Sequence, residues 1–257
     1  MTCTATIVQA RLESTRFPNK IMELIQGKTM LAHVLERCLA VKNSDVVCCA
    51  IPANTDNDIV ATEAECAGAQ VFRGADEDVL DRYHQAARML KADVIMRVTS
   101  DCPLIDPDVC AQVISLRKQQ DVDFATNNIP VAWPHGLDCE VFTFDLLEKT
   151  ATLDKRRWAR EHVTDWMRQN DTVSRSSLPG PGGNLINQRW TVDYFEDVTF
   201  MQALFQKLPV SDKIPSFELI LRTLEENPEI QNLNKMYCER HRDPDKLPKH
   251  DALRVLS

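Results

Sequence analysis

The chain has 257 residues, of which 44% are hydrophobic and 26% are charged, and its formal net charge is −8. This composition is that of an ordinary globular protein, and the negative charge argues against a nucleic-acid binder, which is usually basic. No apolar run approaches the roughly 20 residues of a membrane helix and no signal-peptide pattern is present, so we expect a cytoplasmic protein without membrane or nucleic-acid partners.

Strands and helices alternate through the first half of the chain. Apolar runs predict strands, whereas apolar residues spaced three and four apart predict helices. In chain order we expect a strand at 4–10, a helix at 29–41, a strand at 45–51, a helix at 54–68, a strand at 70–72, a helix at 76–90, a strand at 93–98 and a helix from 106. This order predicts a doubly wound, mostly parallel, Rossmann-like α/β sheet.

The second half of the chain is less regular. We expect a strand at Asp138–Phe144, an amphipathic helix at Lys155–Gln169, a turn at 179–184, a strand at Arg189–Val192, and helices at Glu196–Leu208 and Ser216–Glu226. Residues 1–235 are expected to form a single α/β domain. The charged segment at 236–257 is expected to be a loosely held tail.

The first strand leads into a loop that carries three cations, Arg11, Arg16 and Lys20, together with Ser14. Ligands of an open parallel sheet bind beyond the carboxyl ends of its strands, and arginine and lysine are the side chains that bind phosphate. The chain has neither a Gly-x-Gly-x-x-Gly motif nor a Walker loop, so these side chains would replace a glycine-rich cradle. The alternative is an ordinary solvated loop.

Two carboxylates follow predicted strands. Asp101 comes after the strand at 93–98 and is followed by Pro103, and Asp193 ends the strand at 189–192. Carboxylates at this edge suit Mg²⁺, and phosphate-binding cations beside them suit a nucleoside triphosphate, which together predict nucleotidyl transfer. The alternative for each aspartate is a helix cap or an Asx turn.

Three further residues are candidates for the nucleotide side. Asp78 and Arg82 stand four apart on a predicted helix, which is also the usual spacing of a helical salt bridge. Arg97 lies inside a predicted buried strand and therefore needs an anionic partner, for which we consider Asp101 or a substrate phosphate.

Five ordered segments resemble the CMP-sugar synthetases, and most closely their spore coat polysaccharide biosynthesis protein F-like branch. They are the loop at 7–20, Asp78–Tyr83, His135–Phe142, Arg160–Thr164 and Trp190–Asp193. The resemblance runs from about residue 5 to 235. The chain departs from the family pattern at Asn19 and Ser100, where glycine is usual, and at Phe195, where proline is common. Asparagine tolerates the left-handed backbone that glycine would adopt.

The resemblance implies a nucleotide-diphospho-sugar-transferase-like fold with a substrate and dimerisation insertion at about 130–185. It implies a homodimer that uses CTP and Mg²⁺ to activate an acidic cell-surface sugar as its CMP derivative, releasing pyrophosphate. Arg11, Lys20 and Asp101 would be the catalytic residues, with Asp101 and Asp193 holding the metal.

The polar cluster of His135, Asp138 and Glu140 matches the segment where relatives hold the acceptor sugar, and His162 is a further substrate candidate. Histidine at such a place is more often a structural donor than a general base. Two other functions stay open: a glycosyltransferase, for which Asp121–Asp123 or Asp76–Asp78 would supply an Asp-x-Asp motif, and a non-catalytic nucleotide-binding protein.

Overall fold

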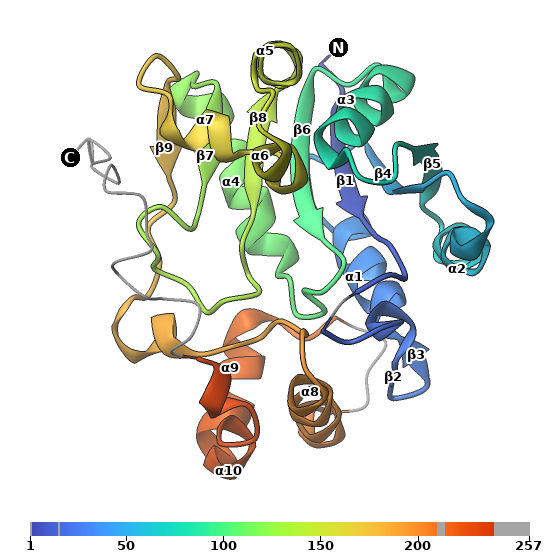
Figure 1. The fold of residues 1–257 in the computed structure, drawn as a ribbon. Coiled ribbons are helices and arrows are strands. Elements are labelled where there is room, and N and C mark those ends of the chain that lie inside the picture. Colours follow the sequence, from blue (N-terminus) through green and yellow to red (C-terminus); the bar gives the residue numbers. More distant parts are fainter. Residues whose placement is uncertain (1, 15, 210–213, 239–257) are drawn as a thin grey trace.

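The structure is a computed structural model that describes residues 2–14, 16–209 and 214–238 (Figure 1). Most of the expected tail at 236–257 lies outside the described residues. The predicted α/β fold with a mostly parallel sheet is confirmed. Seven strands pair in the order β5-β4-β1-β6-β8-β7-β9, and only β8 runs antiparallel to its neighbours. Their bounds are β1 Thr4–Gln9, β4 Val46–Pro52, β5 Gln70–Gly74, β6 Val94–Thr99, β7 Phe124–Thr126, β8 Glu140–Thr143 and β9 Arg175–Ser177.

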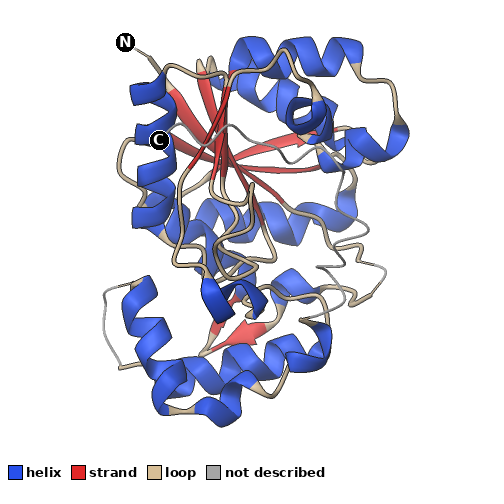
Figure 2. Cartoon of the chain, turned by 90° about the vertical axis from the view of Figure 1, so that its left-hand side faces the viewer, coloured by secondary structure: helices blue, strands red, loops and turns tan. Residues whose placement is uncertain are grey.

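Helices cover both faces of this sheet, as Figure 2 shows from the side. One face packs against α1 (Met30–Leu39), α2 (Asp58–Cys66) and α4 (Pro107–Gln120), and the other against α3 (Val79–Leu90), α5 (Phe144–Leu153) and α7 (Asp165–Gln169). Among the described residues, no helix is long and apolar enough to cross a lipid bilayer.

The two faces of the sheet are buried in separate clusters because successive side chains of a strand point to opposite sides. On β1, Ala5 and Ile7 join the cluster under α3, whereas Val8 joins the cluster under α1. Such two-sided burial explains why the predicted strands read as continuous apolar runs rather than as alternating patterns.

A third group of elements lies beyond the carboxyl ends of β1 and β6, at the bottom of Figure 1. It consists of the hairpin β2 (Leu24–Ile25) and β3 (Lys28–Thr29) with helices α8 (Phe195–Lys207), α9 (Phe217–Glu226) and α10 (Pro228–Gln231). The segment 130–185 instead supplies β8, β9 and α5–α7 to the main sheet and its cover. Pairing of two chains through that segment stays a prediction.

The single helix expected at Lys155–Gln169 is wrong. The chain forms α6 (Arg157–His162) and then α7, separated at Val163, whose φ of 66° and ψ of −58° break the helix. The break has a structural reason, because it lets the Thr164 hydroxyl and the Arg168 guanidinium both reach the buried Glu140 carboxylate. Paired polar groups in the interior offset the cost of one strained residue.

The strand expected at Arg189–Val192 is also wrong. The segment makes one isolated bridge, between His135 and Arg189, and then changes partner: the Trp190 N–H donates to the His135 carbonyl at 2.7 Å and the Val192 N–H to the Asp101 carbonyl at 2.9 Å. Similarly, the helix expected from residue 76 begins at Val79, because the Asp78 side chain caps it by accepting from the Asp81 N–H.

We predict that Gly136→Ala is strongly destabilising, because Gly136 has a φ of +111° and an added Cβ would lie 2.4 Å from the Trp190 carbonyl oxygen. The backbone on both sides would have to move apart, at a cost of about 3 kcal/mol or more. Gly27→Ala is the control: φ is +79° but nothing lies within 4 Å, so about 1 kcal/mol is expected. Urea unfolding measures both, and equal losses would contradict the steric argument.

Candidate active site

The loop after β1 brings a lysine into the interior. Asn19 adopts the left-handed conformation, with φ 59°, as expected for a residue that stands in place of glycine. Its N–H donates to the Leu12 carbonyl, and the Leu12 N–H donates to Asn57 Oδ1, so the loop is closed on itself and tied to the segment before α2. The turn at Asn19 then directs the buried Lys20 side chain toward the ends of the neighbouring strands.

Lys20 lies between the two carboxylates that follow the predicted strands. Its Nζ donates to Asp101 Oδ2 at 3.1 Å and to Asp193 Oδ1 at 2.9 Å, and it also donates to the Val192 carbonyl at 2.7 Å. Three segments far apart in the chain therefore share one positive charge.

This sharing shifts the pKa values of all three groups toward their charged forms. Burial alone would lower the pKa of Lys20, but the two carboxylates outweigh it and raise that pKa above its usual value. Burial alone would raise the pKa values of Asp101 and Asp193, but the Lys20 ammonium outweighs it and lowers both, Asp101 strongly. These three side chains, the Lys20 cluster, are therefore fully ionised near neutral pH.

Neither aspartate acts as the helix cap considered above. Asp106 caps α4 by accepting from the Asp108 and Val109 N–H groups. At α8 the side chain that accepts from the Tyr194 N–H is Asp197. Phe195 occupies the first position of α8 and is exposed, which explains why a residue other than proline is tolerated there.

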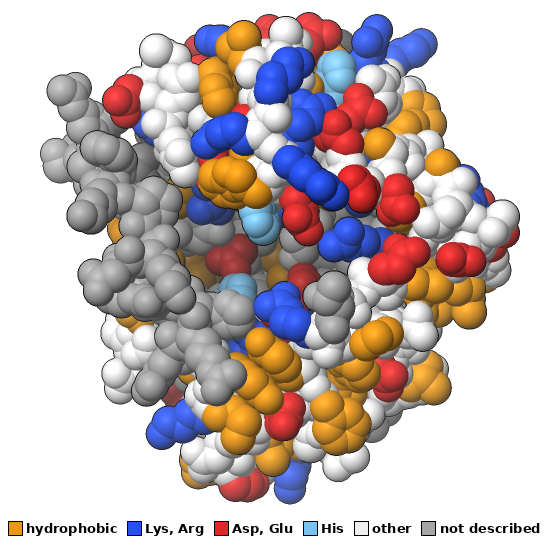
Figure 3. Space-filling model, in the orientation of Figure 1, with side chains coloured by type: hydrophobic (Ala, Val, Ile, Leu, Met, Phe, Trp, Pro, Cys, Tyr) orange, Lys and Arg blue, Asp and Glu red, His pale blue; other side chains and the backbone are white. Residues whose placement is uncertain are grey.

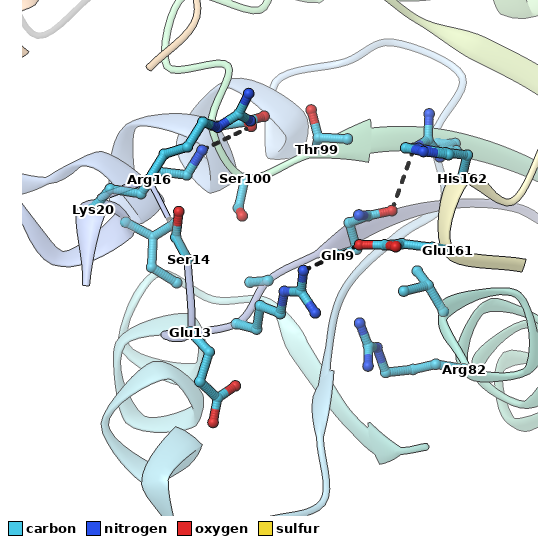
Figure 4. A pocket seen from close by; sticks show the side chains of 16 residues that line it. Gln9, Glu13, Ser14, Arg16, Lys20, Arg82, Thr99, Ser100, Glu161 and His162 are labelled. Atoms are coloured by element: carbon cyan, nitrogen blue, oxygen red, sulfur yellow. Dashed lines mark hydrogen bonds and ion pairs between the residues drawn. The ribbon is translucent and has the colours of Figure 1, made fainter. Parts of the chain in front are cut away.

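Two clefts open at this edge of the sheet, where Figure 3 shows the surface hollowed among charged and histidine side chains. The first, of about 330 Å³, has Arg16 and Lys20 at one end and Arg82, Glu161 and His162 at the other (Figure 4). The predicted residues that line it are Arg11, Ser14, Arg16, Lys20, Arg82, Arg97, Asp101 and His162.

The second cleft, of about 540 Å³, adjoins the first. The predicted residues His135, Asp138 and Asp193 line it, together with residues that the sequence did not single out, such as Asn128, Asp165 and Arg168. The two clefts share a wall made of Arg16, Arg97, Thr99, Asp101 and His162. Groups bound in the two clefts would therefore meet beside Asp101.

The anionic partner of Arg97 is neither Asp101 nor a substrate phosphate, the two groups considered above, but Glu140. Arg97 lies opposite Glu140 in the β6–β8 register, and its Nη1 donates to Glu140 Oε2 at 2.8 Å. Arg168 donates to the other oxygen, Oε1, at 2.7 Å. Burial would raise the pKa of Glu140, but Arg168 and Arg97 outweigh it and lower that pKa. Glu140 thus stays ionised beneath the clefts and does not line either one.

Asp78 and Arg82 do not form the helical salt bridge considered above. Asp78 pairs with Arg160 at 2.8 Å, and Arg82 donates through Nη1 to the Ala75 and Asp76 carbonyls. The Arg82 Nε is buried without a partner among the described residues, and its guanidinium lines the first cleft. Asp78 is therefore structural in this conformation, whereas Arg82 presents a positive charge to the cleft. Neither Asp121–Asp123 nor Asp76–Asp78 lines a cleft.

Sequence reasoning missed one buried arginine beside the cluster. Arg189 donates to Asp193 Oδ2 at 3.0 Å and, through two nitrogens, to both oxygens of Asp197 at 2.9 Å. A signal was present, because Arg189 is followed at intervals of four residues by the oppositely charged Asp193 and Asp197, although residues 189–194 are not helical.

Comparison with known proteins agrees with this geometry. The cytidylyltransferase family matches residues 5–241. The chain is 30% identical to the spore coat polysaccharide biosynthesis protein SpsF of Bacillus subtilis (strain 168), over 87% of this chain and 94% of that protein. It is 35% identical to a 3-deoxy-manno-octulosonate cytidylyltransferase of Anaeromyxobacter dehalogenans over 50% of this chain and 52% of that one. A solved cytidylyltransferase of Leptospira borgpetersenii superimposes with a TM-score of 0.84 at 28% identity, covering 90% and 97% of the two chains.

The shifted pKa values make the stability of the cluster depend on pH in a stated direction. The lowered aspartate pKa values give stability that is present above about pH 4 and is lost as the pH falls through the folded values. The raised Lys20 pKa gives stability that is present below about pH 10 and is lost as the pH rises through the folded value. We expect a plateau between these limits.

We predict that Lys20→Met lowers the free energy of unfolding by at least about 2 kcal/mol at neutral pH, because two carboxylates lose their shared cation. Asp101 then takes up a proton more readily, so this variant gains stability from pH 7 to 5 whereas the wild type does not. Urea unfolding at both pH values measures this. Lys28→Met, which breaks an exposed pair with Glu36, is the control and should change stability by less than about 1 kcal/mol. A parallel pH response of wild type and Lys20→Met would contradict the assignment.

Proposed function

The chain belongs to the cytidylyltransferase family, and from that premise we propose that it transfers the cytidylyl group of CTP to a sugar and releases pyrophosphate. The sugar hydroxyl oxygen forms a bond to the α-phosphorus while the bond from that phosphorus to the pyrophosphate oxygen breaks. The hydroxyl proton is released. In such a reaction the protein contributes positioning and charge stabilisation rather than a covalent intermediate.

The observation that carries the proposal is the position of Lys20, Asp101 and Asp193 where the two clefts meet. The first cleft suits CTP because four basic side chains line it, although the protein as a whole is acidic. Arg11, Arg16, Lys20 and Arg82 would balance the negative charge of the triphosphate. The acceptor sugar fits the second cleft, among His135, Asp138 and Arg168. The α-phosphate would then lie at the shared wall, beside Asp101.

The place where the two clefts meet, at Lys20, Asp101 and Asp193, is called the junction below. Its oxygen donors fit Mg²⁺. Asp101 Oδ2 and Asp193 Oδ1 already converge on one positive charge, the Lys20 ammonium. No group of three or more His, Cys, Asp and Glu side chains in the described ranges could cage a metal, and magnesium commonly takes one or two carboxylates and completes its shell with water and phosphate. Asp101 and Asp193 would hold the ion, which offsets charge on the phosphoryl oxygens when bound. Lys20 would then bind the phosphates.

Arg168 supports an acidic acceptor. It is about one-third exposed in the second cleft, where Glu140 and Asn128 hold two of its nitrogens. Glu140 contacts both Arg97 and Arg168 and cannot neutralise both, so the guanidinium of Arg168 can still pair with a further anion. A sugar carboxylate would balance it by a charge-assisted hydrogen bond.

We predict that the purified chain releases pyrophosphate from CTP only with Mg²⁺ and an acidic sugar of the 3-deoxy-octulosonate or sialate type. Asp101→Asn should lower kcat by about 100-fold or more, because charge stabilisation at the phosphoryl group is lost. It should also lower the free energy of unfolding at neutral pH, by about 2 kcal/mol, because it removes one of the two carboxylates that pair with the Lys20 ammonium. The two kcat values are therefore compared for the folded protein.

Asp108→Asn is the matched control, because this aspartate lies outside both clefts in an exposed pair with Lys42. Its kcat should equal that of the wild type. Breakdown of a nucleotide-sugar without any use of CTP would favour the glycosyltransferase alternative instead, and tight CTP binding without turnover would favour a non-catalytic protein.

We predict that Arg168→Gln raises KM for the acidic acceptor by about 10-fold or more, since one charge-assisted contact is lost, and leaves KM for CTP unchanged. Steady-state kinetics with each substrate varied in turn measure this. Arg157→Gln removes the same charge from the neighbouring helix, outside both clefts, and should leave both constants unchanged. An unchanged acceptor KM in Arg168→Gln would reject the carboxylate contact.

A further inference from the structure

Arg189 is a buried arginine that the reaction above does not use. It is 2% exposed, and its side chain contacts groups on three sides. Nε and Nη2 bind the two oxygens of Asp197, Nη2 also donates to Asp193 Oδ2 at 3.0 Å, and Nη1 lies 3.4 Å from Nδ1 of His135. One guanidinium therefore contacts a residue of each functional part: a carboxylate at the junction and a histidine of the second cleft.

The contact with Asp193 sets the rotation of that carboxylate. Lys20 and Arg16 both donate to Oδ1, at 2.9 and 2.7 Å. Because these two donors hold the same oxygen, they alone would let the carboxylate rotate about its Cβ–Cγ bond. Arg189 is the donor on Oδ2. With both oxygens held, Oδ1 stays directed at Lys20 and Asp101.

The contact with His135 sets the position of its proton. A guanidinium can only donate, so Nδ1 of His135 accepts and the neutral ring carries its hydrogen on Nε2. Nε2 lies on the side of the ring toward Asp138, 3.9 Å from Oδ2, and both residues line the second cleft. The N–H donor of the ring therefore lies toward Asp138, at the wall of the second cleft.

Arg189 is itself fixed from outside the clefts. Asp197 Oδ2 accepts from the Asp193 N–H at 2.8 Å, and Asn234 Nδ2 donates to Asp197 Oδ1 and to the Arg189 carbonyl, each at 3.0 Å. All three side chains are almost fully buried. A planar guanidinium bound side-on to a fixed carboxylate has little freedom to rotate.

We infer that Arg189 is a positioning residue of this active site: its buried guanidinium holds the Asp193 carboxylate toward the junction and holds His135 as the Nε2–H tautomer facing the acceptor cleft. The inference rests on the proposed function for what the two positioned groups do, but its geometry is independent of it. Lysine at this position keeps the charge and loses the planar, three-way contact.

The first test is the tautomer of His135, read by two-bond ¹H–¹⁵N NMR of the full chain at about pH 8, where an ordinary histidine is neutral. In the wild type we expect an unprotonated Nδ1 and a protonated Nε2; a protonated Nδ1 overturns the inference. Arg189→Lys should yield a mixture of tautomers. Arg37→Lys is the control, since Arg37 is equally buried but, within the described residues, donates to the Ile105 and Pro215 carbonyls and to no group of either cleft, and it should keep the wild-type tautomer.

The second test is kinetic. Arg189→Lys should lower kcat by about 10-fold or more through Asp193, raise the acceptor KM several-fold through His135, and weaken Mn²⁺ binding to the CTP-loaded protein, as measured by electron paramagnetic resonance. A merely structural arginine would lower stability while the folded protein kept its tautomer, kcat and Mn²⁺ affinity, and that result overturns the inference.

Two further measurements keep the outcomes separate. If Arg189→Lys does not fold, Asp197→Asn takes its place. This variant keeps the shape of the side chain but replaces one oxygen that accepts from Arg189 by an NH₂ group that cannot accept. It should change the tautomer and kcat in the same directions. If the wild type turns over no CTP with any acceptor, the proposed function fails. The tautomer of His135 in the wild type and in Arg189→Lys then still decides whether Arg189 positions it.

Discussion

The ammonium of Lys20 is the interaction on which the arrangement of this site depends. Asp101 at the end of β6 and Asp193 before α8 meet at this group, which the loop after β1 supplies, and without a cation between them the two carboxylates would repel each other. Burial strengthens the attraction because little water screens it. The group of elements beyond the sheet is therefore joined to the strand ends by charge as well as by apolar packing.

The parts of the site that sequence could predict are those fixed by local geometry. A strand ends where its apolar run ends, so Lys20 and Asp101 could be placed at one edge of the sheet before any coordinates were known. Asparagine tolerates the left-handed backbone that glycine would adopt at this place in the resembling family, and Asn19 does adopt it. These features require no knowledge of which distant segments pair.

The parts that could not be predicted depend on long-range pairing. Glu140 reaches Arg97 only through the antiparallel register of β8 with β6, which no local pattern specifies. The break at Val163 occurs without glycine or proline, and it makes sense only once Glu140 is known to need Thr164 and Arg168. Arg189 has two partners that are near in sequence, Asp193 and Asp197, but its contact with His135, 54 residues away, forms only where the two segments are joined by their bridge.

The charges at the junction suggest how the site tolerates both its free and its bound states. Lys20, Arg16 and Arg189 balance Asp101, Asp193 and Asp197, so each of these six charges has a partner of opposite sign when no ligand is present. A triphosphate with its magnesium brings charges of both signs. When they bind, the two carboxylates can contact the metal while Lys20 and Arg16 contact the phosphates. Each buried charge then keeps a partner of opposite sign. Arg189 takes no part in this exchange because Asp197 already holds it, which is why it can keep Asp193 in place throughout.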